Sequence, residues 1–182
     1  MKEEYVLDLF TGGGGSCQAG RILRNFGYAN WREVCFVEHN QFCQRNLRQR
    51  MRDQVIPEAA IWDDVTTFDP APWSGIVSGV LAGYPCTPWA ASGKHGGEED
   101  PNNMWPHVFR VLRGVKSAKW CFLENSPLLC RSAYHGRILS DLASIGFDAI
   151  WQTRTASSVG ANHKRSRFWQ YCWRDVANTD SD

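Results

Sequence analysis

The chain contains 182 residues, and 43% of them are apolar, which suffices for one globular domain with a buried core. Its formal net charge is +1, so it lacks the overall basic charge typical of proteins that bind nucleic acids through charge alone. Any basic surface must therefore be local. The sequence offers two basic clusters: Arg45, Arg48, Arg50 and Arg52, which we interpret as a solvated face, and His163-Lys164-Arg165-Ser166-Arg167.

The cysteines and the N-terminal segment indicate the cellular compartment. The seven cysteines form no C-x-x-C pair and no zinc-ligand spacing, and their number is odd, which predicts a reduced protein without a metal site. The opening segment MKEEYVLDLF places acids before a short apolar run that Asp8 interrupts, so it is neither a signal peptide nor a membrane span. We therefore expect a soluble, cytoplasmic protein.

The first predicted elements are a strand, a glycine-rich turn, a helix and a second strand. An apolar run at residues 5–7 predicts the first strand, and four consecutive glycines at 12–15 predict a tight turn. Ser16 is the predicted N-cap of the helix that follows, and Gly27 is expected to end that helix. The second strand is predicted over residues 33–37.

Helices and strands continue to alternate through the middle of the chain. We predict a helix over about residues 41–51 and a short strand near residue 61. The apolar run at 75–82 predicts a buried strand. Apolar residues recur at helical spacing from 104 to 115, and residues 120–123 predict the next strand.

The last predicted elements are a helix over residues 138–145 and two strands, over 149–155 and 167–173, which we expect to pair. The whole pattern predicts an α/β fold. Its sheet is expected to be open, mostly parallel and Rossmann-like, with helices on both faces and an antiparallel C-terminal strand pair. We expect one domain over residues 1–174 and a polar tail over 175–182.

Open α/β sheets bind ligands at the carboxyl ends of their strands, and two features there suit a cofactor. The segment from Asp8 to Gly15 follows the first strand, and its glycines let the backbone approach a ligand closely. Glu38 ends the second strand, where its carboxylate can accept hydrogen bonds from both hydroxyls of a ribose. The glycines do not follow G-x-G-x-x-G, so a dinucleotide site is a poor match, and a purely structural turn is the alternative.

Cys86 is the candidate nucleophile among the cysteines. It follows the buried strand at 75–82, and Pro85 and Pro88 stiffen the backbone around its thiol. A lone cysteine is usually a small buried apolar residue, and that is our interpretation of the other six. The proline frame and the position at a strand end favour a chemical role for Cys86.

Charged and polar residues follow the later strands. Glu124 and Asn125 end the strand at 120–123, so adjacent strands would bring Glu124 toward Cys86. A carboxyl group at the end of an apolar strand is desolvated, which raises its pKa and lets it donate a proton near neutral pH. Arg165 and Arg167 alternate on one face if their segment is extended, and guanidinium groups can hold a carbonyl oxygen or a phosphate. A helix-capping acid and a solvated charge run are the structural alternatives.

Six motifs occur in one order along the chain: DLFTGGGG at 8–15, Glu38, Asp64, GYPCTPW at 83–89, ENS at 124–126 and HKRSR at 163–167. In this order they resemble the DNA cytosine carbon-5 methyltransferase family. The resemblance extends from about residue 5 to residue 174, and the Pro-Cys motif followed by Glu-Asn is highly specific. It implies a methyltransferase catalytic domain.

The resemblance implies roles for the catalytic residues. The target cytosine is flipped out of the DNA helix, and the Cys86 thiolate adds to its carbon 6. Glu124 contacts the ring nitrogen at position 3, so carbon 5 becomes nucleophilic and takes the methyl group. A base then removes the carbon-5 proton, and elimination releases Cys86. Arg165 and Arg167 orient the cytosine carbonyl and a nearby phosphate, and Asn125 braces the loop.

The resemblance also implies a cofactor, S-adenosylmethionine, which becomes S-adenosylhomocysteine. The residues expected around its methionine part are Phe10, Gly12, Gly14 and Gly15, within the motif that begins at Asp8. Glu38 is expected to bind the ribose and Asp64 the adenine amino group, and Pro85 and Met104 are expected to line the same pocket.

The chain departs from the family's pattern in several places. Ser16, Ser126 and His163 are uncommon variants, and Ala90 stands where a serine is common in the catalytic loop. Family members usually continue into a target-recognition region and a final helix. We therefore expect this chain to need a second subunit or a C-terminal recognition region for sequence-selective methylation, and to expose an apolar patch beside the cofactor pocket.

Two other functions fit the same residues. A related enzyme class methylates cytosine in tRNA with these motifs, so tRNA is the alternative substrate. A catalytically silent subunit of a split methyltransferase is the second alternative, although the presence of Cys86, Glu124 and Arg167 argues against it. The resemblance also implies a cytoplasmic protein of prokaryotic or phage origin.

Overall fold

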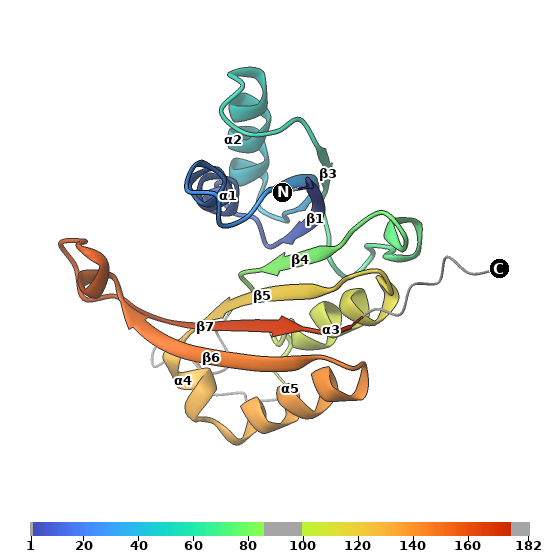
Figure 1. Ribbon diagram of the computed structural model, residues 1–182, viewed down its shortest axis with the longest axis vertical. Coiled ribbons are helices and arrows are strands. Elements are labelled where there is room, and N and C mark those ends of the chain that lie inside the picture. The colour runs from blue at the N-terminus through green and yellow to red at the C-terminus, as the bar shows by residue number, and fades with distance from the viewer. Residues whose placement is uncertain (1, 86–99, 176–182) are drawn as a thin grey trace.

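A twisted seven-stranded sheet organises the computed structural model, which describes residues 2–85 and 100–175 (Figure 1). The strands are β1 (Glu4–Leu9), β2 (Trp31–Val37), β3 (Ala60–Trp62), β4 (Gly79–Ala82), β5 (Trp120–Asn125), β6 (Asp148–Thr155) and β7 (Ser166–Trp173). The helices are α1 (Gly15–Asn25), α2 (Gln41–Arg52), α3 (Trp105–Gly114), α4 (Pro127–Arg131) and α5 (Ala133–Ser144), with short 3-10 helices η1 (Ala71–Trp73) and η4 (Ala156–Val159).

The strands lie in the order β3-β2-β1-β4-β5-β7-β6. The first five strands in the chain are parallel to one another, and β7 is antiparallel to both β5 and β6. The predicted open, mostly parallel sheet with an antiparallel C-terminal strand pair is therefore confirmed. Chain connections reverse direction between β1 and β4, which is the position where open α/β sheets form a ligand crevice.

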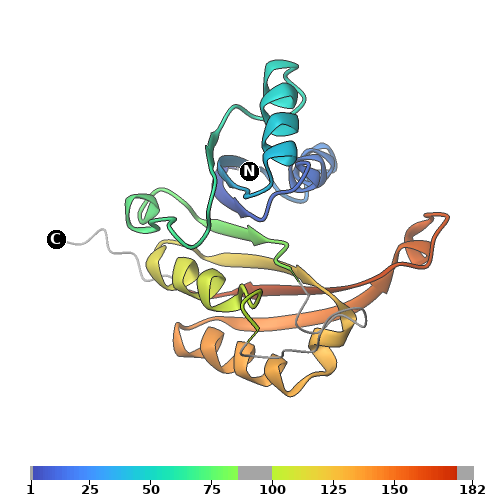
Figure 2. The ribbon, with the colours of Figure 1, turned by 180° about the vertical axis from the view of Figure 1, so that it is seen from behind.

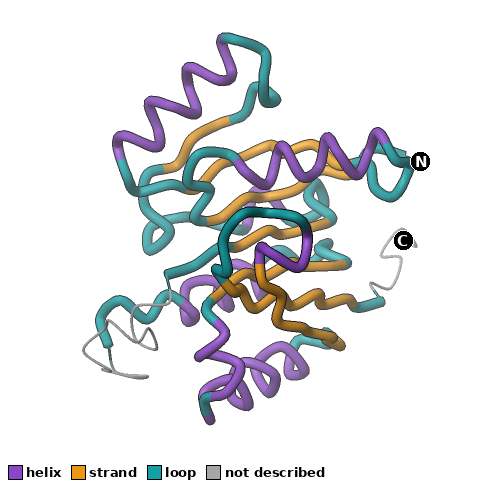
Figure 3. Tube along the Cα trace, turned by 90° about the vertical axis from the view of Figure 1, so that its left-hand side faces the viewer, coloured by secondary structure: helices purple, strands orange, loops and turns teal. Residues whose placement is uncertain are grey.

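Helices cover both faces of the sheet, as Figures 2 and 3 show from two further directions. On one face, Val108, Val111 and Leu112 of α3 pack with β-strand residues such as Val80 and Leu123 in the main core. On the other face, a smaller cluster joins α1 and α2 to β2 through Cys17, Leu47 and Phe36. Among the described residues, no helix is both long and apolar enough to cross a bilayer.

Two local predictions were wrong, and one short helix was missed. Ser16 does not cap α1, because the helix begins one residue earlier after Gly14, whose φ of 80° is left-handed, and the Ser16 hydroxyl instead donates to the Asp8 carboxylate. The strand predicted at 75–82 begins at Gly79, because η1 and the left-handed Gly75 occupy the preceding turn. The short helix α4 was not predicted, and the Ser126 hydroxyl caps it by accepting from Leu128 N at 3.3 Å.

The close packing of β4 against β5 gives the first testable prediction. A Cβ atom on Gly79 would overlap the Trp120 ring, whose Nε1 also donates to Glu4 Oε2 at 2.6 Å. Gly79→Ala is therefore expected to lower the free energy of unfolding by about 1–3 kcal/mol, measured by urea denaturation. Gly136→Ala is the control, since a Cβ there meets nothing within 4 Å and should stabilise α5 by roughly 0.5–1 kcal/mol. Equal effects of the two changes would contradict this packing.

Candidate active site

The carboxyl ends of the central strands meet at one edge of the sheet. Leu9 of β1 pairs with Val37 of β2 and with Ala82 of β4, and Ala82 pairs with Leu123 of β5. The residues that follow these strands are therefore neighbours. Gly83 shows how close they lie, because a Cβ built on it would be 3.5 Å from Glu124 Oε2 and 4.0 Å from the Phe10 carbonyl oxygen.

Glu38 holds the glycine turn in place. Its Oε2 accepts from Gly12 N at 2.6 Å, and its Oε1 accepts from Asn40 N at 2.7 Å. Three residues of the turn have left-handed backbone, with φ of 59° at Phe10, 59° at Gly12 and 80° at Gly14. Phe10 is the unusual one, because a bulky side chain disfavours this conformation, and such outliers cluster at functional sites.

The sequence analysis did not identify two residues that stabilise the glycine turn, Asn40 and Arg50. Asn40 supplies the backbone N–H that binds Glu38, and its side chain caps α2 by accepting from Phe42 N and Cys43 N. Arg50 donates to the Gly13 carbonyl oxygen from the last turn of α2. An Asn immediately before a helical pattern is a readable N-cap signal, whereas the Arg50 contact depends on how α2 packs.

Asp8 is a buried carboxyl group on the central strand, with 3% of its surface exposed. Burial raises the pKa of Asp8 to about 7, and the Ser16 hydroxyl, which donates to its carboxylate, opposes that rise. The negative charges of Glu33 and Glu38 raise this pKa further. Asp8 is therefore close to half-protonated at neutral pH.

An open groove runs from the start of α1 across β4, β5 and β7, and its volume is about 1040 Å³. Asp8, Phe10, Gly15 and Glu124 are among its lining residues, so it joins the glycine turn to the end of β5. Six aromatic rings also line it: Tyr28, Trp31, Trp120, Phe122, Trp169 and Tyr171. The alternation of aromatic residues along β5 and β7 in the sequence was a signal that they share one face of the sheet.

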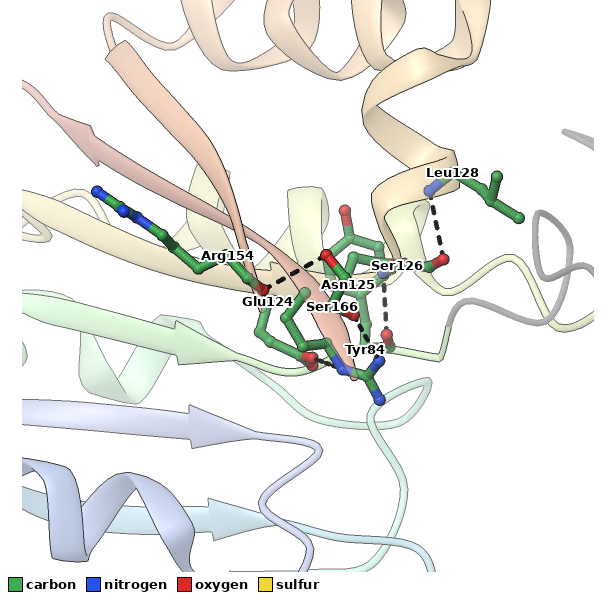
Figure 4. A network of polar contacts seen from close by, with 8 residues as sticks. Tyr84, Glu124, Asn125, Ser126, Leu128, Arg154 and Ser166 are labelled. Atoms are coloured by element: carbon green, nitrogen blue, oxygen red, sulfur yellow. Dashed lines mark hydrogen bonds and ion pairs between the residues drawn. The ribbon is translucent and has the colours of Figure 1, made fainter. Parts of the chain in front are cut away.

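Asn125 connects the end of β5 to the segment before Cys86. It is 2% exposed, its Nδ2 donates to the Tyr84 carbonyl oxygen at 3.1 Å, and its Oδ1 accepts from Ser126 N at 2.7 Å. Figure 4 shows these contacts beside Glu124. Cys86 and Ala90 lie outside the described residues, and Pro85 is the last described residue before them.

Glu124 forms an ion pair with Arg167 across the β5–β7 ladder, and both side chains are about one quarter exposed (27% and 26%). Burial raises the pKa of Glu124, and the positive charge of Arg165 opposes that rise. The contact with Arg167 itself favours the ionised carboxylate. Arg165 lies just before β7 and is exposed, so the two arginines occupy different surroundings.

Several residues predicted to bind the cofactor are not among those that line the groove: Gly12, Gly14, Glu38, Asp64, Pro85 and Met104. Asp64 Oδ1 accepts from Thr66 N at 2.8 Å in the turn after β3, and this backbone hydrogen bond lowers the pKa of Asp64. Met104 precedes α3 and packs partly buried against the main core. Their predicted roles in the cofactor pocket stay predictions. Among residues 2–85 and 100–175, no group of three or more His, Cys, Asp or Glu side chains could hold a metal ion.

Comparison with known proteins identifies the family. The sequence model of the C-5 cytosine-specific DNA methylase family matches residues 5–180, nearly the whole chain. The chain belongs to this family. It is similar to the type II methyltransferase M.CviJI of Paramecium bursaria Chlorella virus IL3A, with 31% identity over 90% of this chain and 41% of that protein. It is also 25% identical to M.NgoMIV of Neisseria gonorrhoeae, over 88% of this chain and 49% of that protein.

Two solved structures of methyltransferases share the fold. Spodoptera frugiperda DNMT2 superposes with a TM-score of 0.72 and 18% identity, over 98% of this chain and 52% of that one. Entamoeba histolytica EhMeth superposes with a TM-score of 0.74 and 17% identity, over 100% of this chain and 56% of that one. The chain spans less than half the length of the two methyltransferases to which it is similar in sequence.

The buried Asp8 predicts that the free energy of unfolding depends on pH. A folded-state pKa raised to about 7 means that the folded protein binds this proton more tightly than the unfolded chain does, so stability is lost as pH rises from about 4 to above 7. Asp8→Asn should remove that loss and raise the free energy of unfolding at pH 8 by up to about 4 kcal/mol, with little change at pH 4. The measurement is urea denaturation across this pH range, and parallel pH profiles for variant and wild type would contradict it.

Proposed function

We propose that this chain transfers a methyl group from S-adenosylmethionine to carbon 5 of cytosine in DNA. The observation that carries the proposal is the contact of Glu124 with Arg167 at the sheet edge where the Tyr84-Pro85 segment ends. An acid, an arginine and the approach to Cys86 thus converge beside the glycine turn. Family membership supports the same reaction class.

The groove fits a cofactor built from a nucleoside and an amino acid. Its volume of about 1040 Å³ is in the range of ligand pockets, and its aromatic wall offers stacking surface for a base. A Cβ on Gly12 or Gly15 would meet nothing within 4 Å, so open space lies beside the turn for a ligand's polar groups. Phe10 and Gly15 line the groove and would hold the methionine part together with Gly12 and Gly14 of the same turn. Glu38 does not line the groove, but it binds the turn at Gly12 and would bind the ribose from there. Bound there, S-adenosylmethionine supplies the methyl group.

The residues of the chain would perform the remaining steps on the base. The Cys86 thiolate would bond to carbon 6 and leave again once the carbon-5 proton has gone to a base. Glu124 would contact the ring nitrogen at position 3, because a desolvated carboxyl group with a raised pKa can hold a proton there. Arg167 would remain in contact with Glu124 while Glu124 binds the cytosine. Arg165 would bind the carbonyl oxygen of the cytosine or a nearby phosphate.

The described cysteines support Cys86 as the nucleophile. Burial raises the pKa of the Cys17 thiol, and it raises the pKa of Cys35 to about 12, so neither ionises near neutral pH. Cys121 and Cys172 face each other inside the sheet and are fully buried. Cys130 is partly exposed, and its Sγ donates to the Pro127 carbonyl oxygen at 3.2 Å. It therefore makes a useful control.

A covalent adduct between Cys86 and the base is the central prediction. Duplex DNA with 5-fluorocytosine should trap the wild-type chain in the presence of S-adenosylmethionine, because fluorine cannot leave carbon 5 as a proton does. Cys86→Ala should abolish the adduct seen by denaturing electrophoresis, and Cys130→Ala should leave it unchanged. Trapping that depends on a different cysteine would contradict the role of Cys86. If the methyl group of labelled S-adenosylmethionine is transferred to tRNA and not to DNA, the substrate is tRNA and the DNA proposal is wrong.

Cofactor affinity tests the role of Glu38. Glu38→Gln removes the charge but keeps one acceptor for the turn, so it should weaken S-adenosylhomocysteine binding by about 1.5–3 kcal/mol, the worth of a charge-assisted hydrogen bond. Calorimetry measures the affinity, and Glu58→Gln, at an exposed position, controls for the lost charge. Unchanged affinity in Glu38→Gln would contradict the ribose contact.

A further inference from the structure

The C-terminal hairpin carries basic side chains; residues 149–174, which include η4, β7 and all of β6 except its first residue, are called the arm below. The sequence from Ala149 to Arg174 contains no aspartate or glutamate, and its basic residues are Arg154, His163, Lys164, Arg165, Arg167 and Arg174. Since the whole chain has a net charge of only +1, this segment concentrates positive charge.

One end of the arm is tied into the core and the other end is free. At the tied end, the Arg174 guanidinium donates to the Ala118 and Ile145 carbonyl oxygens at 2.7 and 2.9 Å and lies 4.4 Å from the Phe147 ring centre. At the free end, the strand pair projects past the rest of the sheet, with η4 at its tip (Figures 1 and 2). The remaining basic residues of the arm belong to this free part.

Two arginines face each other where the arm leaves the sheet. The last pair of the β5–β7 ladder is Asn125 with Phe168, and the next pair along the arm is Arg154 with Arg167. Like charges directly opposite each other destabilise a strand pair. Glu124 neutralises Arg167 but not Arg154, whose Nε donates to the uncharged Gln152 Oε1 at 2.9 Å.

Arg154 is therefore an exposed cation without a countercharge among the described residues. No described carboxylate forms an ion pair with Arg154, Lys164 or Arg165. Arg154 is exposed, and Figure 4 shows its side chain pointing away from Glu124. Its carbonyl oxygen accepts from the Ser166 hydroxyl at 3.4 Å. The backbone at this position is thus held by the ladder, and the guanidinium group is available to a ligand.

We propose that Arg154 binds a backbone phosphate of duplex DNA and that the free part of the arm docks along the phosphates beside the target base. A guanidinium group matches phosphate oxygens in bidentate geometry, and a phosphate here would also relieve the repulsion between the two arginines. Arg154 pairs with Arg167 two residue pairs beyond the Glu124–Trp169 pair, so this contact lies close to Glu124. The inference rests on the proposed function, because it takes DNA as the substrate.

The test is the salt dependence of DNA binding by the whole chain, measured by fluorescence anisotropy with a labelled duplex and S-adenosylhomocysteine present. Arg154→Gln should lower the slope of log affinity against log salt by about 1 and weaken binding about five- to tenfold at 0.1 M salt, because one phosphate contact releases close to one counterion. Arg154→Lys should keep most of the slope. Arg113→Gln removes the same charge from an exposed position at the end of α3 and should match the wild type.

Methyl transfer separates this inference from the proposed function. Arg154→Gln should raise the KM for DNA and leave kcat and S-adenosylhomocysteine affinity unchanged, since Arg154 touches neither the described groove nor Glu124. Its Tm at low salt should equal or exceed that of the wild type, because the like-charge pair is gone. If the wild-type chain methylates DNA but Arg154→Gln has the same salt slope as the wild type, the role of Arg154 is wrong and the proposed function stands. Binding of an acidic protein but not of DNA by the wild type overturns both proposals.

Discussion

Parallel pairing of β1 on both of its edges is the constraint on which the rest of the molecule depends. Leu9 lies in register with Val37 on one side and with Ala82 on the other, so three strands end together. A shift of one residue in either register would turn Asp8 from the α1 face to the α3 face, because successive side chains alternate. The glycine turn, Glu38 and Glu124 would then no longer meet.

Three buried carboxyl groups cluster on the α1 side of this edge. Asp8, Glu33 and Glu38 are each at most 8% exposed, and each accepts a hydrogen bond from an N–H or O–H group at or near the turn or β2. Burial away from water is the largest cause of the raised pKa of Asp8, and the charges of Glu33 and Glu38 raise it further. The same concentration of acceptors at a helix start is an unfavourable place for a phosphate, which suits a cofactor that carries hydroxyls and a positive charge.

The face of β5 and β7 toward α1 is open and aromatic in the part of the chain that the structure describes. Trp120, Phe122, Trp169 and Tyr171 line the groove from strands that have no helix above them on this side. Aromatic side chains on a half-open face give both a stacking surface for planar ligands and apolar area that favours burial. Glu124, the groove and the arm thus lie along one side of the sheet.

The sequence by itself determined the fold class, the family and the order of the site motifs, because glycine turns, strand-ending acids and the proline-framed Cys86 are local patterns. It also indicated that Glu124 would approach the segment of Cys86, since parallel strands end at one edge. Local patterns could not show that Ser16 bonds to Asp8 instead of capping α1, that Glu38 clamps Gly12, or that Arg50 reaches Gly13. Those contacts join residues from different elements, and so does the pairing of Arg154 with Arg167. Only the packing of helices on the sheet and the register of its strands decide which of these side chains meet.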